Sequence, residues 1–102
     1  PTWTFISRQR VLLSPVSRRV ELAVKECLLL ATLIVEPGRT AKRAILLDSI
    51  YGLQDNNTER ALDTLVRRTR RKIEMATGVP APILTEHGVG YAFVANIRVV
   101  EN

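Results

Sequence analysis

Hydrophobic and polar residues alternate near the two ends of the chain and repeat with a helical period between them. Residues 2–6 alternate and are rich in aromatic and β-branched types, which predicts a strand. Residues 10–14 predict a second strand, and Val20 and Leu22 are typical of a short third one. We therefore expect a small antiparallel sheet within residues 1–22.

A first helix is expected over residues 24–35. Its apolar residues form two stripes, which predicts burial on both sides of the helix, with a subunit interface as the alternative. The stripes are Cys27, Leu30, Leu33 and Ile34, and Leu28, Thr32 and Val35. The helix must end near Glu36, because Pro37 disfavours helical geometry in the residue before it.

Two further helices follow in the middle of the chain. The second is expected over residues 41–51 and is closed by Gly52. The third is expected over residues 58–75, and Asn56 with Glu59 resembles a capping box at its start. Its apolar positions recur with the helical period and should face the core: Leu62, Val66, Thr69 and Ile73.

The last predicted element is a hairpin. Residues 83–86 and 90–95 read as its two strands around a short turn, with Gly88 and Gly90 easing the turn. Strands, three helices and a hairpin within 102 residues predict one α+β domain over 1–102. Its parts would be the sheet at 1–22, the helices at 24–75 and the hairpin at 83–95.

The charge of the chain is unevenly distributed. Its formal net charge is +5, with a pI of about 10.1. Residues 58–74 carry six Lys and Arg against three acidic residues, whereas residues 75–102 carry one against two. A concentration of positive charge in one segment is the footprint expected of a protein that binds nucleic acid.

Other classes of function find little support. One cysteine and one histidine exclude a disulfide framework and are too few for a structural zinc site. No phosphate-binding glycine loop or nucleophile–base pair stands out, so we expect no enzyme and no cofactor. A single cysteine in an apolar run fits a reducing, cytoplasmic setting, and no apolar run predicts contact with a membrane. The chain begins with Pro1, so a longer parent protein is expected.

Turning the apolar stripe of the third helix inward leaves an arginine-rich outer face. That face holds Arg60, Asp63, Thr64, Arg67, Arg68 and Arg71, with Arg70 and Lys72 on its flanks. Guanidinium groups can bond guanine edges in a major groove and can also grip phosphates. The alternative for such a run is a solvated basic face. The hairpin favours the first interpretation, since helix–turn–helix followed by a hairpin is the winged-helix order.

Four blocks of sequence occur in order and with fitting gaps. They are residues 25–30 with Leu33 and 37–39; Arg43 with 46–47 and 50–52; residues 60–74; and Ile83, Thr85 and 88–93. Together they resemble the OmpR/PhoB-type winged-helix domain, the DNA-binding effector domain of bacterial two-component response regulators. The resemblance covers nearly the whole chain. It implies sequence-specific binding of double-stranded DNA for transcription regulation, with residues 58–75 in the major groove and the wing at 83–95 beside them.

The resemblance also implies a role for individual residues. Arg68 would be the main base reader, with Thr64 and Asp63 beside it. The contacts to the DNA backbone would come from Arg43, Arg60, Arg67, Arg70, Arg71 and Tyr91. The wing would be formed around His87, Gly88 and Gly90. A loop facing RNA polymerase would consist of Leu53, Gln54, Asp55, Asn56 and Asn57. A receiver domain would precede the chain in its parent protein.

Some positions depart from the family pattern. His87 stands where a minor-groove arginine is common in the family, with acidic Glu86 beside it. Its side chain is interpreted as solvated, with a weak phosphate contact and a pH sensor as the alternatives. A rival hypothesis is a winged helix that binds protein through Ile45, Leu65 and Leu28 while its basic helix is only solvated. Because the chain lacks a long heptad, we expect a monomer in free solution. The family resemblance implies two copies on tandem half-sites of DNA.

Overall fold

The computed structural model describes residues 1–101. A four-stranded sheet is built from β1 (Thr2–Ile6), β2 (Val11–Leu13), β3 (Arg19–Glu21) and β7 (Asn96–Val100) in the order β3-β2-β1-β7. A 3-10 turn, η1 (Ser7–Gln9), joins β1 to β2. The first three strands confirm the expected antiparallel pairing. The sheet is nevertheless mixed, because β7 pairs parallel with β1.

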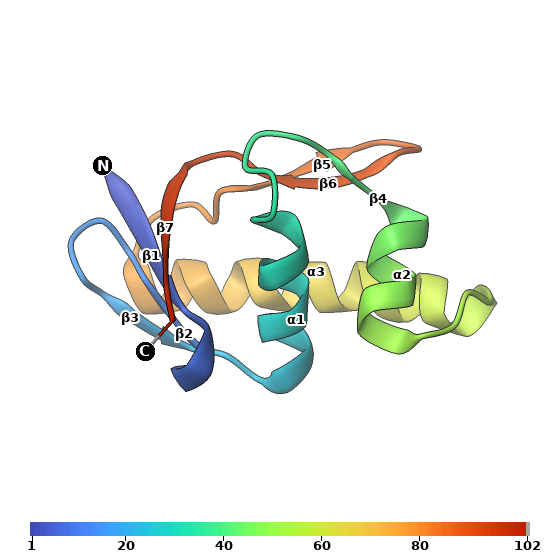
Figure 1. The fold of residues 1–102 in the computed structure, drawn as a ribbon, viewed down its shortest axis with the longest axis horizontal. Coiled ribbons are helices and arrows are strands. Elements are labelled where there is room, and N and C mark those ends of the chain that lie inside the picture. Colours follow the sequence, from blue (N-terminus) through green and yellow to red (C-terminus); the bar gives the residue numbers. More distant parts are fainter. Residues whose placement is uncertain (102) are drawn as a thin grey trace.

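Three helices follow the first strands. They are α1 (Val24–Leu33), α2 (Arg43–Tyr51) and α3 (Asn56–Thr77). Figure 1 shows α1 lying across α3, with the four-stranded sheet near one end of α3 and α2 near the other. The two strands β5 (Ile83–Glu86) and β6 (Gly90–Phe93) form the expected hairpin, to which the short strand β4 (Ala41–Lys42) adds. The winged-helix order of elements is therefore confirmed.

The ends of several elements differ from the expected ones. The second helix begins at Arg43, not at residue 41, because Ala41 and Lys42 pair with Tyr91 and Gly90 in the second sheet. The third helix begins at Asn56, and its cap is Asp55, whose Oδ1 accepts from the Thr58 backbone N–H at 2.8 Å. The predicted Asn56–Glu59 capping box was therefore wrong.

One core joins all the elements. Its largest fully buried side chains come from β1, β2, all three helices and β6: Phe5, Leu12, Leu29, Leu30, Leu33, Leu46, Leu47, Leu62, Ile73 and Phe93. The rings of Trp3 and Phe93 meet edge to face with centroids 6.4 Å apart, which ties β1 to β6. Within residues 1–101 no helix has the length and apolar character to cross a membrane.

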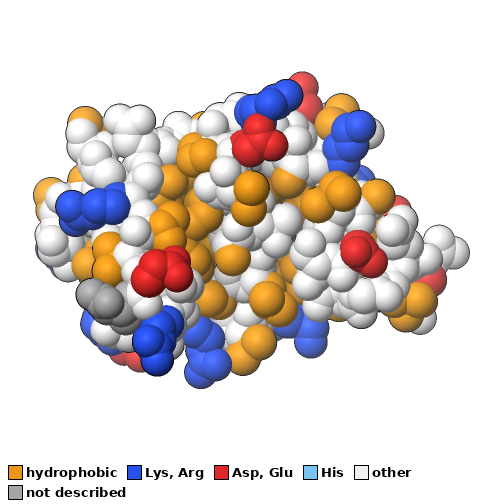
Figure 2. Space-filling view, in the orientation of Figure 1, with side chains coloured by type: hydrophobic (Ala, Val, Ile, Leu, Met, Phe, Trp, Pro, Cys, Tyr) orange, Lys and Arg blue, Asp and Glu red, His pale blue; other side chains and the backbone are white. Residues whose placement is uncertain are grey.

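The second apolar stripe of α1 is not part of this core, which corrects the expectation of burial on both sides. Val35 is 75% exposed and Leu28 is 39% exposed. Figure 2 shows hydrophobic side chains gathered over and beside α1 on the face seen in Figure 1. The elements that pack against α1 are α2, α3 and β6, and Leu28 on the helix stays partly exposed. The helix ends at Leu33, not at residue 35, so Val35 lies in the turn that follows and is in contact with solvent.

Candidate nucleic-acid interface

The two faces of α3 have opposite character. Leu62, Leu65, Val66, Thr69 and Ile73 are buried. Thr69 is satisfied there, because its hydroxyl donates to the Leu65 carbonyl oxygen at 2.7 Å. The expected inward stripe is thus confirmed, with Leu65 added to it. Burial of Leu65 at 2% exposure also removes it from the rival protein-binding surface, of which Ile45 and Leu28 remain exposed.

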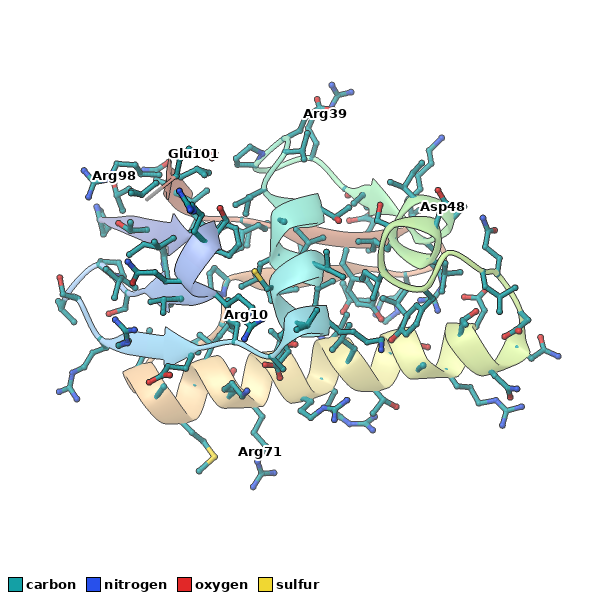
Figure 3. The ribbon with its side chains drawn as sticks, turned by 60° about the horizontal axis from the view of Figure 1, so that its bottom comes forward. Arg10, Arg39, Asp48, Arg71, Arg98 and Glu101 are labelled. Atoms are coloured by element: carbon teal, nitrogen blue, oxygen red, sulfur yellow. The ribbon has the colours of Figure 1, made fainter. Side chains whose placement is uncertain are left out.

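The outer face of α3 presents arginines to solvent. Arg60, Arg67, Arg68 and Arg71 are all exposed, as is Thr64 between them. Within residues 1–101 none of these four guanidinium groups makes a hydrogen bond or an ion pair. Figure 3 shows Arg71 projecting from α3 away from the rest of the domain. Four unpaired cations along one helix form a strip that attracts a polyanion.

Arg43 and Asp63 have a different environment from these four arginines. Arg43 begins α2, and its Nη1 donates to Asp63 Oδ1 at 2.8 Å while its Nε donates to Glu59 Oε1 at 2.8 Å. These bonds raise the pKa of Arg43 further above its already high value. Burial alone would raise the pKa of Asp63, but the hydrogen bonds from Arg43 and Tyr91 outweigh it and hold that pKa below its usual value.

Tyr91 and Arg70 connect α3 to the hairpin. Tyr91 is buried in β6, and its hydroxyl donates to Asp63 Oδ1 at 2.6 Å. Burial raises the pKa of Tyr91, and the bond to Asp63 adds to that effect. Arg70 donates to the Ile83 carbonyl oxygen at 3.0 Å and to Thr85 Oγ1 at 2.6 Å, with its guanidinium carbon 5.7 Å from the Tyr91 ring centre.

The tip of the wing carries no arginine or lysine. His87 and Gly88 are exposed, and Gly88 has a left-handed φ of +78°, which supports the expectation that it eases the turn. Gly90 has another reason to be glycine. It is buried in β6, where a Cβ atom would overlap the Ala41 carbonyl oxygen of β4. Glycine therefore lets the wing approach the start of α2.

A groove lies between the first turn of α1 and the outer face of α3. Its charged and aromatic lining includes Lys25, Tyr51, Arg60 and Arg68. Lys25 Nζ lies 5.8 Å from the centre of the Tyr51 ring. Burial raises the pKa of Tyr51, and the positive charge of Arg68 opposes that shift. Sequence pattern gives no signal for Lys25 and Tyr51 as interface residues, because they belong to helices that contact α3 only in the folded chain.

The remaining candidates lie between α2 and α3. All five residues of the predicted RNA polymerase-facing loop, 53–57, are exposed, although Asn56 and Asn57 belong to the first turn of α3.

In the described part of the chain, no three His, Cys, Asp or Glu side chains are grouped as metal ligands would be. Cys27 is half-buried in α1, and burial raises the pKa of its thiol.

A buried helix stripe, an unpaired arginine face and an adjoining hairpin define the class of protein, a winged-helix DNA-binding domain. The chain belongs to the family of C-terminal domains of transcriptional regulatory proteins, the OmpR/PhoB type, whose family model matches residues 17–93. This confirms the family predicted from the four sequence blocks.

Individual relatives agree with that assignment. Regulatory protein VirG of Agrobacterium tumefaciens is 34% identical over 97 residues, which are 95% of this chain and 36% of VirG. The chain thus spans about a third of the length of this relative. The crystal structure of the DNA-binding domain of Bacillus subtilis CssR covers 90% of this chain and 99% of its own, with 27% identity and a TM-score of 0.71. The Klebsiella pneumoniae RstA DNA-binding domain, solved in complex with the RstA box, covers 82% of this chain and 90% of its own, with 25% identity and a TM-score of 0.64.

Proposed function

We propose that this domain binds specific sites on double-stranded DNA and so regulates transcription, with α3 in the major groove and the β5–β6 wing beside it. The observation that carries the proposal is the strip of four unpaired arginines on the outer face of α3. An α-helix fits a B-DNA major groove, and unpaired guanidinium groups can bond phosphates and guanine edges without first losing a protein partner.

Within that strip we assign two kinds of contact. Arg68 lies midway along α3 and would read bases, with Thr64 one turn before it on the same face. Arg60, Arg67 and Arg71 would hold phosphates. Lys25 and Tyr51 line the groove beside Arg60 and Arg68 and would widen the contact with the DNA backbone. The wing would meet DNA through exposed His87 and Gly88, without an arginine for the minor groove.

The salt dependence of binding tests the electrostatic part of the proposal. Each phosphate contact contributes about 0.9 to the slope of log affinity against log salt, so the contacts of the three phosphate-holding arginines and of Lys25 predict a slope of roughly −3 to −4 on a mixed-sequence duplex. Arg71→Gln should reduce the steepness by about one unit. Arg98→Gln is the matched control, because Arg98 lies on β7, in the four-stranded sheet, and Figure 3 shows it far from Arg71. A flat salt response would refute the proposal and favour a protein partner at Ile45 and Leu28.

Sequence reading is tested on a preferred site selected from a random pool of duplexes. Arg68→Ala should weaken that site by about 1–3 kcal/mol and leave binding to random duplex nearly intact. Arg67→Ala should weaken both duplexes about equally, because a phosphate contact carries no sequence information. If the two variants lose the same affinity on both duplexes, Arg68 is not a base reader.

Several partners extend the proposal beyond the domain. As the effector domain of a two-component response regulator in the cytoplasm, it would follow a receiver domain in its parent protein. The exposed 53–57 loop would face RNA polymerase. The free domain would be a monomer, and two copies would occupy half-sites roughly one helical turn, about 10–10.5 base pairs, apart. Light scattering of the free domain and footprinting on the selected site test the two halves of that statement.

A further inference from the structure

A continuous series of polar contacts joins α2, α3 and the wing. Arg43 of α2 donates to Asp63 of α3, and Tyr91 of the wing donates to the same oxygen, Oδ1. The Tyr91 ring lies near the guanidinium group of Arg70, which is itself a residue of α3. Arg70 in turn donates to the Ile83 carbonyl oxygen and to Thr85 on the other strand of the wing. The side chains around Asp63 and Arg70 thus connect α2, α3 and the wing to one another.

The two carboxylates beside Arg43 do not favour a phosphate at its guanidinium group. Arg43 contributes one positive charge, and Glu59 and Asp63, which lie 2.7 and 2.8 Å from its nitrogens, contribute two negative charges. These three groups carry one excess negative charge, which the positive charge of Arg70 balances in the cluster as a whole. A DNA phosphate brought to Arg43 would have to compete with two carboxylates already in contact with it. Arg43 therefore differs in kind from the unpaired arginines of the outer face.

The geometry of Asp63 and Arg70 also separates them from base readers. A carboxylate reads DNA by accepting a bond from the cytosine amino group. Two donors from α2 and the wing meet at Oδ1 of Asp63 and orient its carboxylate toward them. The planar guanidinium of Arg70 binds both a backbone carbonyl and a hydroxyl of β5, an arrangement that lysine could not reproduce.

We infer that Asp63 and Arg70 are positioning residues: they fasten the wing to the recognition helix through Tyr91, Thr85 and Arg43, and they do not contact DNA. This inference rests on the proposed function for its consequence, which concerns binding. A wing held at a fixed angle to α3 before DNA arrives need not be ordered during binding, so less affinity is lost to ordering. The specificity of the domain then depends on residues that touch no base.

The first arm of the test uses the free domain, so its outcome does not depend on DNA binding. Asp63→Asn removes the negative charge that holds Arg43, and Tyr91→Phe removes only the hydroxyl. Asp48→Asn is the control, because it makes the same change of charge at an exposed position of α2. We expect amide hydrogen exchange at residues 86–90 to become several-fold faster in the two test variants and to stay unchanged in the control. Unchanged exchange in both test variants would overturn the inference.

The second arm measures binding to the selected site, to its single-base-pair variants and to random duplex. Asp63→Asn should lower the ratio of specific to non-specific affinity about tenfold while the ranking of bases at every position stays the same. A change of preference confined to one base pair would show that Asp63 reads a base and would overturn the inference. If the wild-type domain binds no duplex, the proposed function fails, but the exchange result still decides whether the fastening exists.

Discussion

The close approach of the wing to β4 gives a sharp test of the fold around the interface. A Cβ atom on Gly90 would overlap the Ala41 carbonyl oxygen, would lie 2.9 Å from the Ala41 carbonyl carbon and would lie 3.2 Å from the Arg43 backbone nitrogen. All three atoms belong to the backbone, so no side-chain rotation can relieve the overlap. Gly90→Ala must therefore push β4 away from β6.

The cost follows from the bonds that depend on this approach. They are the Lys42–Gly90 pairing of β4 with β6 and the bond from the Arg43 N–H to the Val89 carbonyl oxygen at 3.0 Å. Each backbone hydrogen bond contributes about 0.5–1.5 kcal/mol net, and a buried group left unpaired costs more, so we expect a loss of about 2–4 kcal/mol. For a domain of this size that corresponds to a fall in Tm of roughly 10–25 °C.

Gly88→Ala is the matched control. Gly88 is two residues away in the same turn, and no heavy atom lies within 4 Å of its added Cβ. Only its left-handed φ of +78° opposes the substitution, at a cost of about 1–2 kcal/mol. Thermal melts and urea titrations followed by circular dichroism compare the two variants. If Gly90→Ala is as stable as Gly88→Ala, then β4 does not lie against β6 as described, and the placement of Arg43 beside α3 is wrong with it.

Three further outcomes are expected. Thr69→Val should change the unfolding free energy by less than about 0.5 kcal/mol in chemical denaturation, because the lost hydroxyl serves only a helix carbonyl. Thr77→Val should cost about 1–2 kcal/mol, because the Thr77 hydroxyl also accepts from the Val79 N–H, and equal costs would contradict this. Since the pKa of Asp63 is lowered from 3.8, its contribution to stability is present above that value and is lost as pH falls through the lower folded pKa. Asp63→Asn should flatten this acid limb in urea titrations between pH 6 and 2, and an unchanged limb would show that Asp63 is not held by Arg43.

Local pattern was enough to predict the parts of this domain that depend on one element at a time. The helical period of α3 placed its buried stripe and its arginine face correctly, because which side chains share a face depends only on spacing along the helix. The order of the first three strands, the three helices and the hairpin followed from such patterns together with glycine and proline positions. Where neighbouring residues offered equivalent chemistry, pattern failed: three cap-forming residues, Asp55, Asn56 and Asn57, adjoin the start of α3, and the cap is the first of them.

Long-range pairing was not predictable in the same way. Strand β7 was missed because its role depends on β1, which lies more than ninety residues earlier in the chain. Strand β4 has two residues and exists only through its pairing with β6. The second predicted stripe of the first helix was expected in the core, yet α1 ends at Leu33, so Val35 lies in the turn beyond it and is exposed.

In the candidate interface, too, some features follow from the sequence and others only from the folded structure. The sequence by itself determined which family the domain resembles, which helix is basic and which of its faces is apolar, since spacing along the chain decides which side chains share a helix face. Only the tertiary structure decided which arginines are free. Arg43 and Arg70 match the family pattern as well as Arg67 and Arg68 do, but their partners lie 13 to 20 residues away in the chain on other elements. Hydrogen bonds and ion pairs act only at short range and fixed angle, so the packing of α2, α3 and the wing determines which arginines remain available to bind DNA.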